Sequence, residues 1–232
     1  MSRTTCGNDF HFGDINHEAV EAFLTHCKDK QPEKIILQEL LDAHRLSSFN
    51  KVPGFGDTFE EEIVYTKIFL KKLREVCPKS QIIYIESNHE IRFKQLIWNN
   101  VQEMSGLSGF SIPELLHLEE LNIQWVPIQD GAAKFVDNFV EDQGFLIGHF
   151  NAVRKGSGNT VRGLLDKYGK NVIQGHVHRL AQIYKTVYDK TLVGVESGCL
   201  CSLKPSWMRY PDWQNGFVDI VDGKIELHHI TP

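Results

Sequence analysis

Short apolar runs alternate with longer amphipathic stretches as far as about residue 178, and this alternation limits the folds that the chain can adopt. The runs have the length and content of buried strands. They are the run 35–37 and runs within "QIIYIESNHE", "NIQWVPI", "AKFVDNFVEDQGFLIGHF" and "NVIQGHVHR", and they follow a first, more polar strand predicted at 3–7. Strands that alternate with helical segments predict a sheet built from βα units and covered by helices.

The helical stretches between these runs carry recognisable start and stop signals. Residues 17–28 and 58–76 repeat apolar residues at helical spacing, and Thr58 with Glu61 forms a capping-box pair. Ser111 with Glu114 repeats that pair and predicts a short helix that ends near Glu120. A further helix is expected from about 160 to 168, where Gly169 stops it.

After residue 180 the predicted strands follow one another directly. The last two are joined by Asp222 and Gly223, a strong two-residue hairpin signal. We expect βα units to build one sheet and these later antiparallel strands to build another. The fold class predicted is α/β, with two mixed β-sheets packed face to face and flanked by helices in four αββα layers. No repeat or linker is found, so residues 1–232 are expected to form one domain.

The composition excludes several classes of protein. The formal net charge of −5 argues against a protein that holds long nucleic acid through a broad basic surface, although a local basic stretch lies at 154–162. The five cysteines are scattered along the sequence, and their spacing is not that of a disulfide framework. No apolar run approaches the ~20 residues of a membrane span, and no signal peptide precedes the first strand. A cytoplasmic protein without membrane contact is expected.

Side chains typical of metal ligands follow five of the predicted strands. They are Asp9, His11, Glu39, Asp42, Asn88, His89, His149, His176 and His178. The carboxyl ends of strands in an open α/β sheet face one region, so these groups can meet there. Imidazole with carboxylate and amide oxygen suits Mn, Fe, Zn or Ni. Two such ions about 3.5–4 Å apart can hold a phosphoryl group and activate a bridging water.

In sequence order these motifs are D-x-H, a G-D-x-x-D-like segment, an N-H-E, a later single His and G-H-x-H. This series resembles that of the calcineurin-like metallophosphoesterases, and "SNHEIR" and "GHVHRL" are similar to the bacterial and phage branch of that family. The resemblance implies a first metal ion on Asp9, His11 and His178 and a second on Asn88, His149 and His176, with Glu39 bridging them. It also implies that His89 is catalytic, and that Arg92 and Arg179 bind substrate phosphate.

The function implied by the resemblance is hydrolysis of a phosphodiester or phosphomonoester, nucleotide or nucleic-acid-derived, by attack of a metal-bridging hydroxide. The implied cofactors are two divalent metal ions, Mn first, with Fe, Zn or Ni as alternatives. The sequence departs from the family at Gln38-Glu39, where Gly-Asp is usual, and at Ser87 and Phe150, where Gly is common. Two alternatives stay open: a catalytically impaired metal-binding or interaction module, and a DNA nuclease that uses residues 154–162.

Other motifs are interpreted as structural. Cys199 and Cys201 indicate ordinary packing, and His228-His229 indicates a solvated strand end. Asn88 can also cap the helix that follows it. The aromatic loop with Trp207, Tyr210 and Trp213 can stack a base, close the core or form a dimer interface, so a homodimer is left open.

Overall fold

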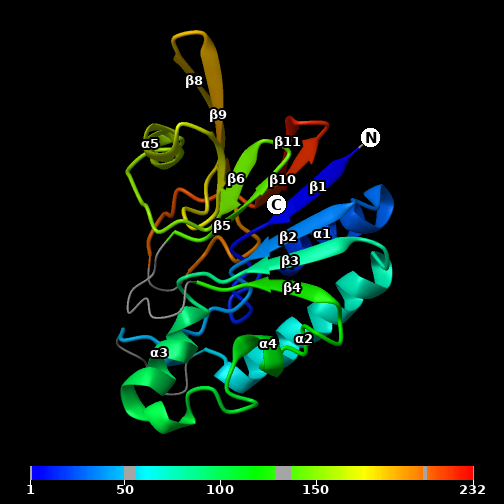
Figure 1. Ribbon diagram of the computed structural model, residues 1–232, viewed down its shortest axis with the longest axis vertical. Coiled ribbons are helices and arrows are strands. Elements are labelled where there is room, and N and C mark those ends of the chain that lie inside the picture. The colour runs from blue at the N-terminus through cyan, green and yellow to red at the C-terminus, as the bar shows by residue number, and fades with distance from the viewer. Residues whose placement is uncertain (1, 50–55, 129–136, 206–207, 232) are drawn as a thin grey trace.

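In the computed structural model, residues 2–49, 56–128, 137–205 and 208–231 are described (Figure 1). The first sheet has the strand order β11-β10-β1-β2-β3-β4. Its strands are β1 (Arg3–Gly7), β2 (Lys34–Gln38), β3 (Gln81–Ile85), β4 (Ile123–Val126), β10 (Gly216–Val221) and β11 (Lys224–His229). The second sheet has the order β5-β6-β7-β9-β8. Its strands are β5 (Phe139–Asp142), β6 (Phe145–Gly148), β7 (Asn171–Gln174), β8 (Leu180–Val187) and β9 (Lys190–Ser197).

The helices lie outside the two sheets, so the predicted fold class is confirmed (Figure 1). They are α1 (His17–Lys30), α2 (Phe59–Val76), α3 (Ile91–Asn100), α4 (Ile112–Leu115) and α5 (Asn159–Tyr168), with 3₁₀ turns at His44–Leu46 and Gln102–Met104. The capping box at Thr58 is present, because Thr58 accepts from the Glu61 N–H and Glu61 accepts from the Thr58 N–H. None of the described helices is long and apolar enough to cross a membrane.

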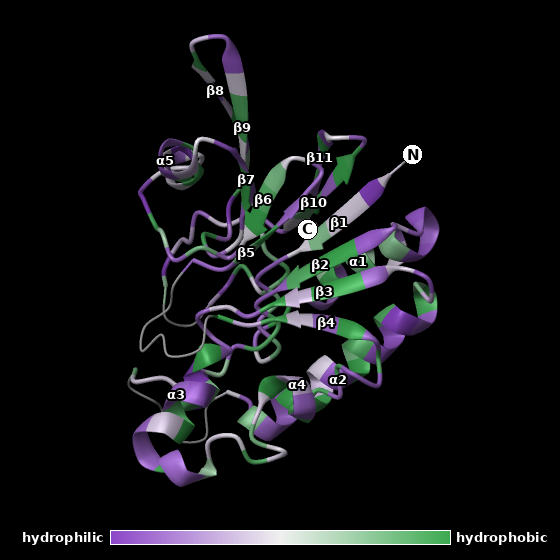
Figure 2. Cartoon of the chain, viewed as in Figure 1, coloured by the Kyte–Doolittle hydropathy of each residue, from purple (hydrophilic) through white to green (hydrophobic). Residues whose placement is uncertain are grey.

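Alternation along the strands divides the apolar residues among three cores. On β2, Ile35 and Leu37 pack under α1 and α2, whereas Ile36 faces the second sheet. Residues such as Ile147 and Val195 complete the core between the sheets, and a third core joins α5 to the second sheet. Figure 2 shows the resulting apolar character of β2 and β3. Burial on both faces explains their continuous apolar runs.

The expected division of strands between the sheets is wrong. The C-terminal hairpin β10–β11 joins the first sheet, where β10 pairs antiparallel with β1. The second sheet contains three mutually parallel strands, β6, β7 and β9. Local sequence indicates that a strand forms but does not specify its partner across more than 200 residues, as in the pairing of Arg3 with Val221.

Two local predictions also need correction. The helix that starts after Ser111 ends at Leu115 and not near Glu120, because the backbone of His117 turns into the left-handed region. His228 is not a solvated strand end: its Nε2 lies 3.2 Å from Asp219 Oδ2, and its ring stacks on Phe217. His229 beside it is exposed, as expected.

The buried carboxylate of Asp219, on β10, connects that strand to three other elements. It accepts from Thr5 on β1 at 2.6 Å, pairs with Arg3 on β1, and contacts His26 on α1 and His228 on β11. Although burial raises the pKa of Asp219, its hydrogen bonds with the two histidines and with Thr5 outweigh burial and hold that pKa below the usual range. The charged carboxylate therefore stabilises the fold at neutral pH.

We expect Asp219→Asn to lower the free energy of unfolding by about 1–3 kcal/mol at pH 7. Because the folded-state pKa is depressed, this contribution is present above the unfolded pKa of about 3.9 and is lost as pH falls below it. Urea unfolding near pH 7 and near pH 3 measures the difference, which should shrink at the lower pH. Asp29→Asn, at the exposed end of α1, is the matched control and should change little. An equal loss at both pH values would contradict the assignment.

Candidate metal centre

Loops that leave the carboxyl ends of β1, β2, β3, β6 and β7 converge on one region between the sheets. The loops after β1 and β2 are hydrogen bonded to each other, with the Phe10 N–H donating to Glu39 O at 2.9 Å and the Phe12 N–H to Leu40 O at 2.7 Å. The non-glycine residues in the left-handed region include five of the predicted ligands: Asp9, His11, Glu39, His176 and His178. Such strained backbone is concentrated at functional sites.

The structure brings six of the seven predicted ligands into two adjoining clusters. Asp9, His11, Glu39 and His178 have ligand atoms within 4.8 Å of one another, and so do Glu39, His149 and His176. In the first cluster, His11 Nε2 lies 3.2 Å from His178 Nε2, which lies 3.4 Å from Asp9 Oδ1. In the second, His149 Nε2 lies 3.0 Å from both His176 Nδ1 and Glu39 Oε2. Glu39 belongs to both clusters.

The donor set fits divalent cations. Two ring nitrogens at 3.0–3.2 Å cannot both carry a proton directed at the other, so at least one nitrogen of each pair presents a lone pair that a cation can bind. Glu39 Oε2 and Asn88 Oδ1 are buried and accept no hydrogen bond from the described residues. Buried acceptors without donors are rare in folded proteins. A cation supplies the missing positive charge, and imidazole with carboxylate favours a transition metal.

The electrostatics of the site favour the metal-binding forms of its histidines. Burial lowers the pKa of His149 well below its ordinary value and that of His176 to about 4, so both rings are neutral at pH 7. Burial and then the charge of Asp9 raise the pKa of Glu39 well above its ordinary value. Burial also acts on Asp9, but its electrostatic interaction and hydrogen bond with His178 outweigh burial and lower the Asp9 pKa. The neutral imidazole is the form that binds metal.

His89 lies at the edge of the clusters. Its Nε2 is 3.4 Å from Glu39 Oε1 and its Nδ1 is 3.3 Å from Asp42 Oδ1. Burial lowers the pKa of His89 to about 3. Asp42 also lies 3.1 Å from His11 Nδ1, so one carboxylate orients both rings. Sequence analysis included Asp42 among the strand-end carboxylates but assigned it no role. The E-x-x-D spacing of Glu39 and Asp42 was the one signal that could have indicated a role for it.

The two arginines predicted to bind phosphate are placed differently. Arg92 Nη1 donates to Asp42 O at 2.7 Å, which brings it beside the clusters. Arg179 Nε lies 3.2 Å from the exposed Asp212, and its Nη1 donates to Arg154 O at 3.0 Å. Both contacts of Arg179 lie outside the ligand set.

The departures from the family motifs acquire physical explanations. Ser87 donates through its hydroxyl to Glu90 and accepts from the His89 N–H at 3.1 Å, so it holds the loop that carries His89. Phe150 has a left-handed backbone and a buried ring in the core under α5. Gln38 is buried beside Gly175, where an added Cβ would lie 3.2 Å from Gln38 Oε1, Asp9 Oδ2 and His149 Nδ1. Glycine at 175 therefore permits the close approach of the two strand ends.

Buried carboxyl groups that sequence reasoning missed hold the site loops in place. Glu62 on α2 accepts from the N–H groups of Asp42 and Ala43 at 3.0 and 2.7 Å, and burial raises its pKa to about 8. Glu90 accepts from Tyr84 Oη at 2.6 Å, from the N–H of Leu41 at 3.1 Å and from that of Ser87 at 3.0 Å. No sequence motif indicates these contacts, and those to Leu41, Asp42 and Ala43 span 19 to 49 residues.

Other predicted features surround the centre. Cys199 and Cys201 are buried, as packing residues should be, but Cys201 Sγ also lies 3.6 Å from His178 Nδ1. The ring of Trp213 lies 4.1 Å from that of His178, whereas Tyr210 is fully exposed. Trp207 lies outside the described residues. The aromatic loop thus covers one side of His178.

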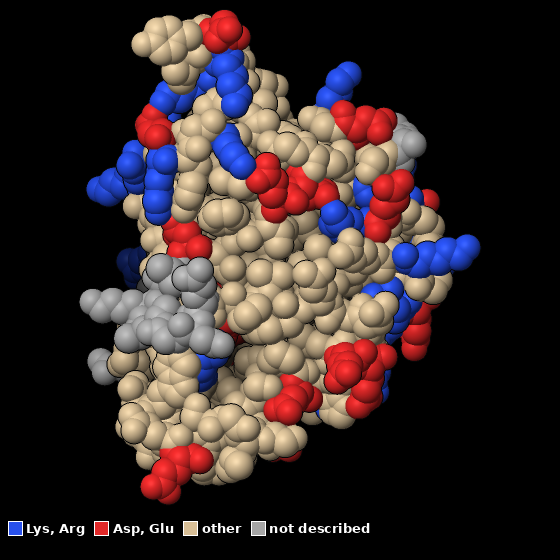
Figure 3. Space-filling view, in the orientation of Figure 1, with Lys and Arg blue, Asp and Glu red and all other residues tan. Residues whose placement is uncertain are grey.

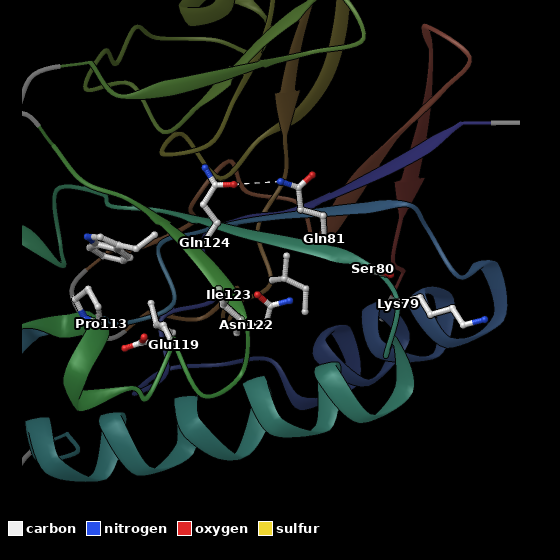
Figure 4. A pocket seen from close by; sticks show the side chains of 11 residues that line it. Lys79, Ser80, Gln81, Pro113, Glu119, Asn122, Ile123 and Gln124 are labelled. Atoms are coloured by element: carbon white, nitrogen blue, oxygen red, sulfur yellow. Dashed lines mark hydrogen bonds between the residues drawn. The ribbon is translucent and has the colours of Figure 1, made fainter.

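A separate pocket of about 590 Å³ lies along β3, β4 and α4 (Figure 4). Gln81 Nε2 on β3 donates to Gln124 Oε1 on β4 at 3.1 Å beside it, and Lys79 and Glu119 belong to its lining. None of the predicted site residues lines this pocket. It is therefore distinct from the metal centre.

No protein-family model matches the chain, and no curated protein matches it. Among solved structures, wild-type Vps29 from Entamoeba histolytica in complex with Zn²⁺ is 12% identical over 98% of each chain, with a TM-score of 0.45. Vps29 from Chaetomium thermophilum is 9% identical over 99% of this chain and 97% of that chain, with a TM-score of 0.48. The Thermotoga maritima protein TM1076 is 11% identical over both full chains, with a TM-score of 0.40.

We predict that Glu90→Ala lowers the free energy of unfolding by about 3 kcal/mol, because it leaves the buried N–H groups of Leu41 and Ser87 without acceptors. Urea unfolding measures the change. Glu90→Gln keeps an acceptor and should cost less, and the exposed Glu103→Ala serves as the control. A loss no greater than that of Glu103→Ala would show that Glu90 does not hold the loops.

Proposed function

We propose that this chain is a metal-dependent phosphoesterase with a dinuclear centre. The observation that carries the proposal is the shared position of Glu39. Its Oε2 lies 3.6 Å from His11 Nε2 in one cluster and 3.0 Å from His149 Nε2 in the other. A carboxylate shared by two sets of histidines is the arrangement that two neighbouring cations require.

In this proposal one ion is held by Asp9, His11 and His178, and Asn88, His149 and His176 hold the other, with Glu39 common to both. The orphaned Asn88 Oδ1 supports the inclusion of that amide. Manganese is the first choice, with iron, zinc or nickel as alternatives. When bound, such ions polarise phosphoryl oxygens and lower the pKa of bound water.

The chain's own residues supply proton transfer and orientation. Asp42 Oδ1 lies 3.3 Å from His89 Nδ1, so its negative charge stabilises the protonated form of that ring. The negative charge of an entering phosphate also favours that form, opposing the effect of burial. His89 Nε2 then donates a proton to the leaving-group oxygen. Arg92, fixed by its bond to Asp42 O, is positioned to hold a phosphate oxygen.

The substrate proposed is a phosphodiester or phosphomonoester of a nucleotide or nucleic acid. The five cysteines are all free and buried, which accords with action in a reducing cytoplasm.

One observation favours the alternative of a metal-binding module without turnover: Asp9, Glu39 and His149 are at most 1% exposed, so access to the centre is narrow. Measurement of turnover separates the two.

We expect hydrolysis of bis-p-nitrophenyl phosphate that depends on added Mn, Ni, Zn or Mg, most strongly on Mn. His89→Ala should lower kcat by about 10²–10⁴-fold while metal stoichiometry stays at two ions per chain, because His89 moves a proton and binds no metal. Steady-state kinetics and elemental analysis measure the two quantities. His117→Ala, an exposed histidine on another loop, is the control.

Turnover that is equal in wild type and His89→Ala would support the non-catalytic module. Loss of metal in His89→Ala would mean that His89 is itself a ligand.

Metal binding should release about one proton per chain at pH values between the ordinary carboxyl pKa and the raised pKa of Glu39. The raised pKa of Glu39 means that its carboxyl keeps a proton where a free carboxyl has lost it, and the cation must expel that proton. His176, with a pKa of about 4, is already neutral there and contributes none. Titration calorimetry of Mn²⁺ in two buffers of different ionisation enthalpy measures the release. Glu39→Gln should reduce it by about one proton, and an unchanged value would contradict the role of Glu39.

A further inference from the structure

Positive charge is concentrated in one part of the chain. Residues 154–192 contain eight Lys and Arg against two Asp, a net charge of +6, whereas the whole chain carries −5. This stretch forms α5, β7, β8 and the start of β9. Figure 3 shows Lys and Arg side chains gathered where Figure 1 places α5 and the projecting β8–β9 hairpin. The charge is therefore segregated in space as well as in sequence.

Half of these cations have no acidic partner in the part of the chain that the structure describes. Arg179, Lys167, Lys170 and Lys185 each contact a carboxylate. The others, which are Arg154, Lys155, Arg162 and Lys190, are exposed and lie within 4.0 Å of no carboxylate among the described residues. Exposed, unneutralised cations on an acidic protein attract an anionic partner.

The loop that carries Arg154 and Lys155 is fixed beside the metal centre. Gln174 Nε2 at the end of β7 donates to Ala152 O at 3.0 Å, and Arg179, next to His178, donates to Arg154 O. At its other end the loop is held by Glu196, which accepts from the Gly158 N–H at 2.8 Å. This loop begins directly after His149. Arg154 and Lys155 therefore lie a few residues beyond one of the predicted metal ligands.

The tip of the hairpin presents an aromatic ring to solvent. Tyr188 is 98% exposed and occupies the two-residue turn with φ of +54°, a conformation that Gly or Asn adopts more readily. A large side chain in this strained position gains no burial in the fold. Exposed aromatic rings beside cations are the platform on which single-stranded nucleic acids stack their bases.

We infer that a basic face, defined by Arg154, Lys155, Arg162, Lys190 and Tyr188, binds a strand of nucleic acid. Phosphates contact the four cations and a base stacks on Tyr188. The inference extends the proposed function, since the strand would lead toward the metal centre, but binding itself requires no metal. A nucleic-acid strand offers regularly spaced phosphates to the cations and bases to the aromatic ring of Tyr188. An acidic peptide would match only the positive charge.

The test is fluorescence anisotropy of a labelled single-stranded oligonucleotide of about 20 nucleotides with the full chain in EDTA, across a range of NaCl concentrations. Wild type should bind with an affinity that falls linearly in a log–log plot against salt. The variant Arg154→Gln/Lys155→Gln/Arg162→Gln should bind at least about tenfold more weakly, with a slope shallower by about 2, since each phosphate contact on a single strand contributes about 0.7.

The matched control Lys28→Gln/Lys30→Gln/Lys71→Gln removes the same charge from exposed positions on α1 and α2 and should bind like wild type. Tyr188→Gly suits the positive φ, so the turn is retained while the ring is lost, and affinity should fall about tenfold. Absence of salt-dependent binding, an equal loss in the control, or equally strong binding of anionic vesicles would overturn the inference. Failure of this test leaves hydrolysis of bis-p-nitrophenyl phosphate unaffected, so it is distinguishable from failure of the proposed function.

Discussion

The buried carboxylate of Glu39 sets the central constraint on this structure. It stands between two groups of histidine nitrogens, and the fold removes it almost completely from water. A charged carboxylate in such a place is costly unless a positive charge accompanies it. Burial keeps the neighbouring rings of His149 and His176 neutral, so they do not supply that charge. In the proposed function, cations supply that charge.

Much of the surrounding structure serves to hold this arrangement. The parallel pairing of β1, β2 and β3 brings their carboxyl ends to one edge, and β6 and β7 bring theirs to the same region from the other sheet. Glu62 and Glu90 hold the site loops in place by accepting hydrogen bonds from backbone N–H groups. Because several loop residues have left-handed backbones, these hydrogen bonds oppose strain that would otherwise relax the site.

Features that depend on neighbouring residues in the sequence were predictable. The strands β1 and β2, the capping box at Thr58 and the hairpin turn at Asp222 all agree with the structure. The meeting of the motif residues was also predictable, because strand ends share an edge. Features set by distant residues were not: the pairing of β10 with β1 and the hydrogen bond from the Leu41 N–H to Glu90 join residues far apart in the sequence. The contact of His228 with Asp219 across the hairpin was missed as well.

The central claim is that two cations occupy these clusters, and anomalous diffraction from crystals soaked in Mn²⁺ tests it most directly. The account predicts two anomalous peaks roughly 3.5–4 Å apart, with the carboxylate of Glu39 in contact with both. One peak should lie against His11 and His178, the other against His149 and His176. A structure in which these rings point away from each other, with no peak between them, would contradict it.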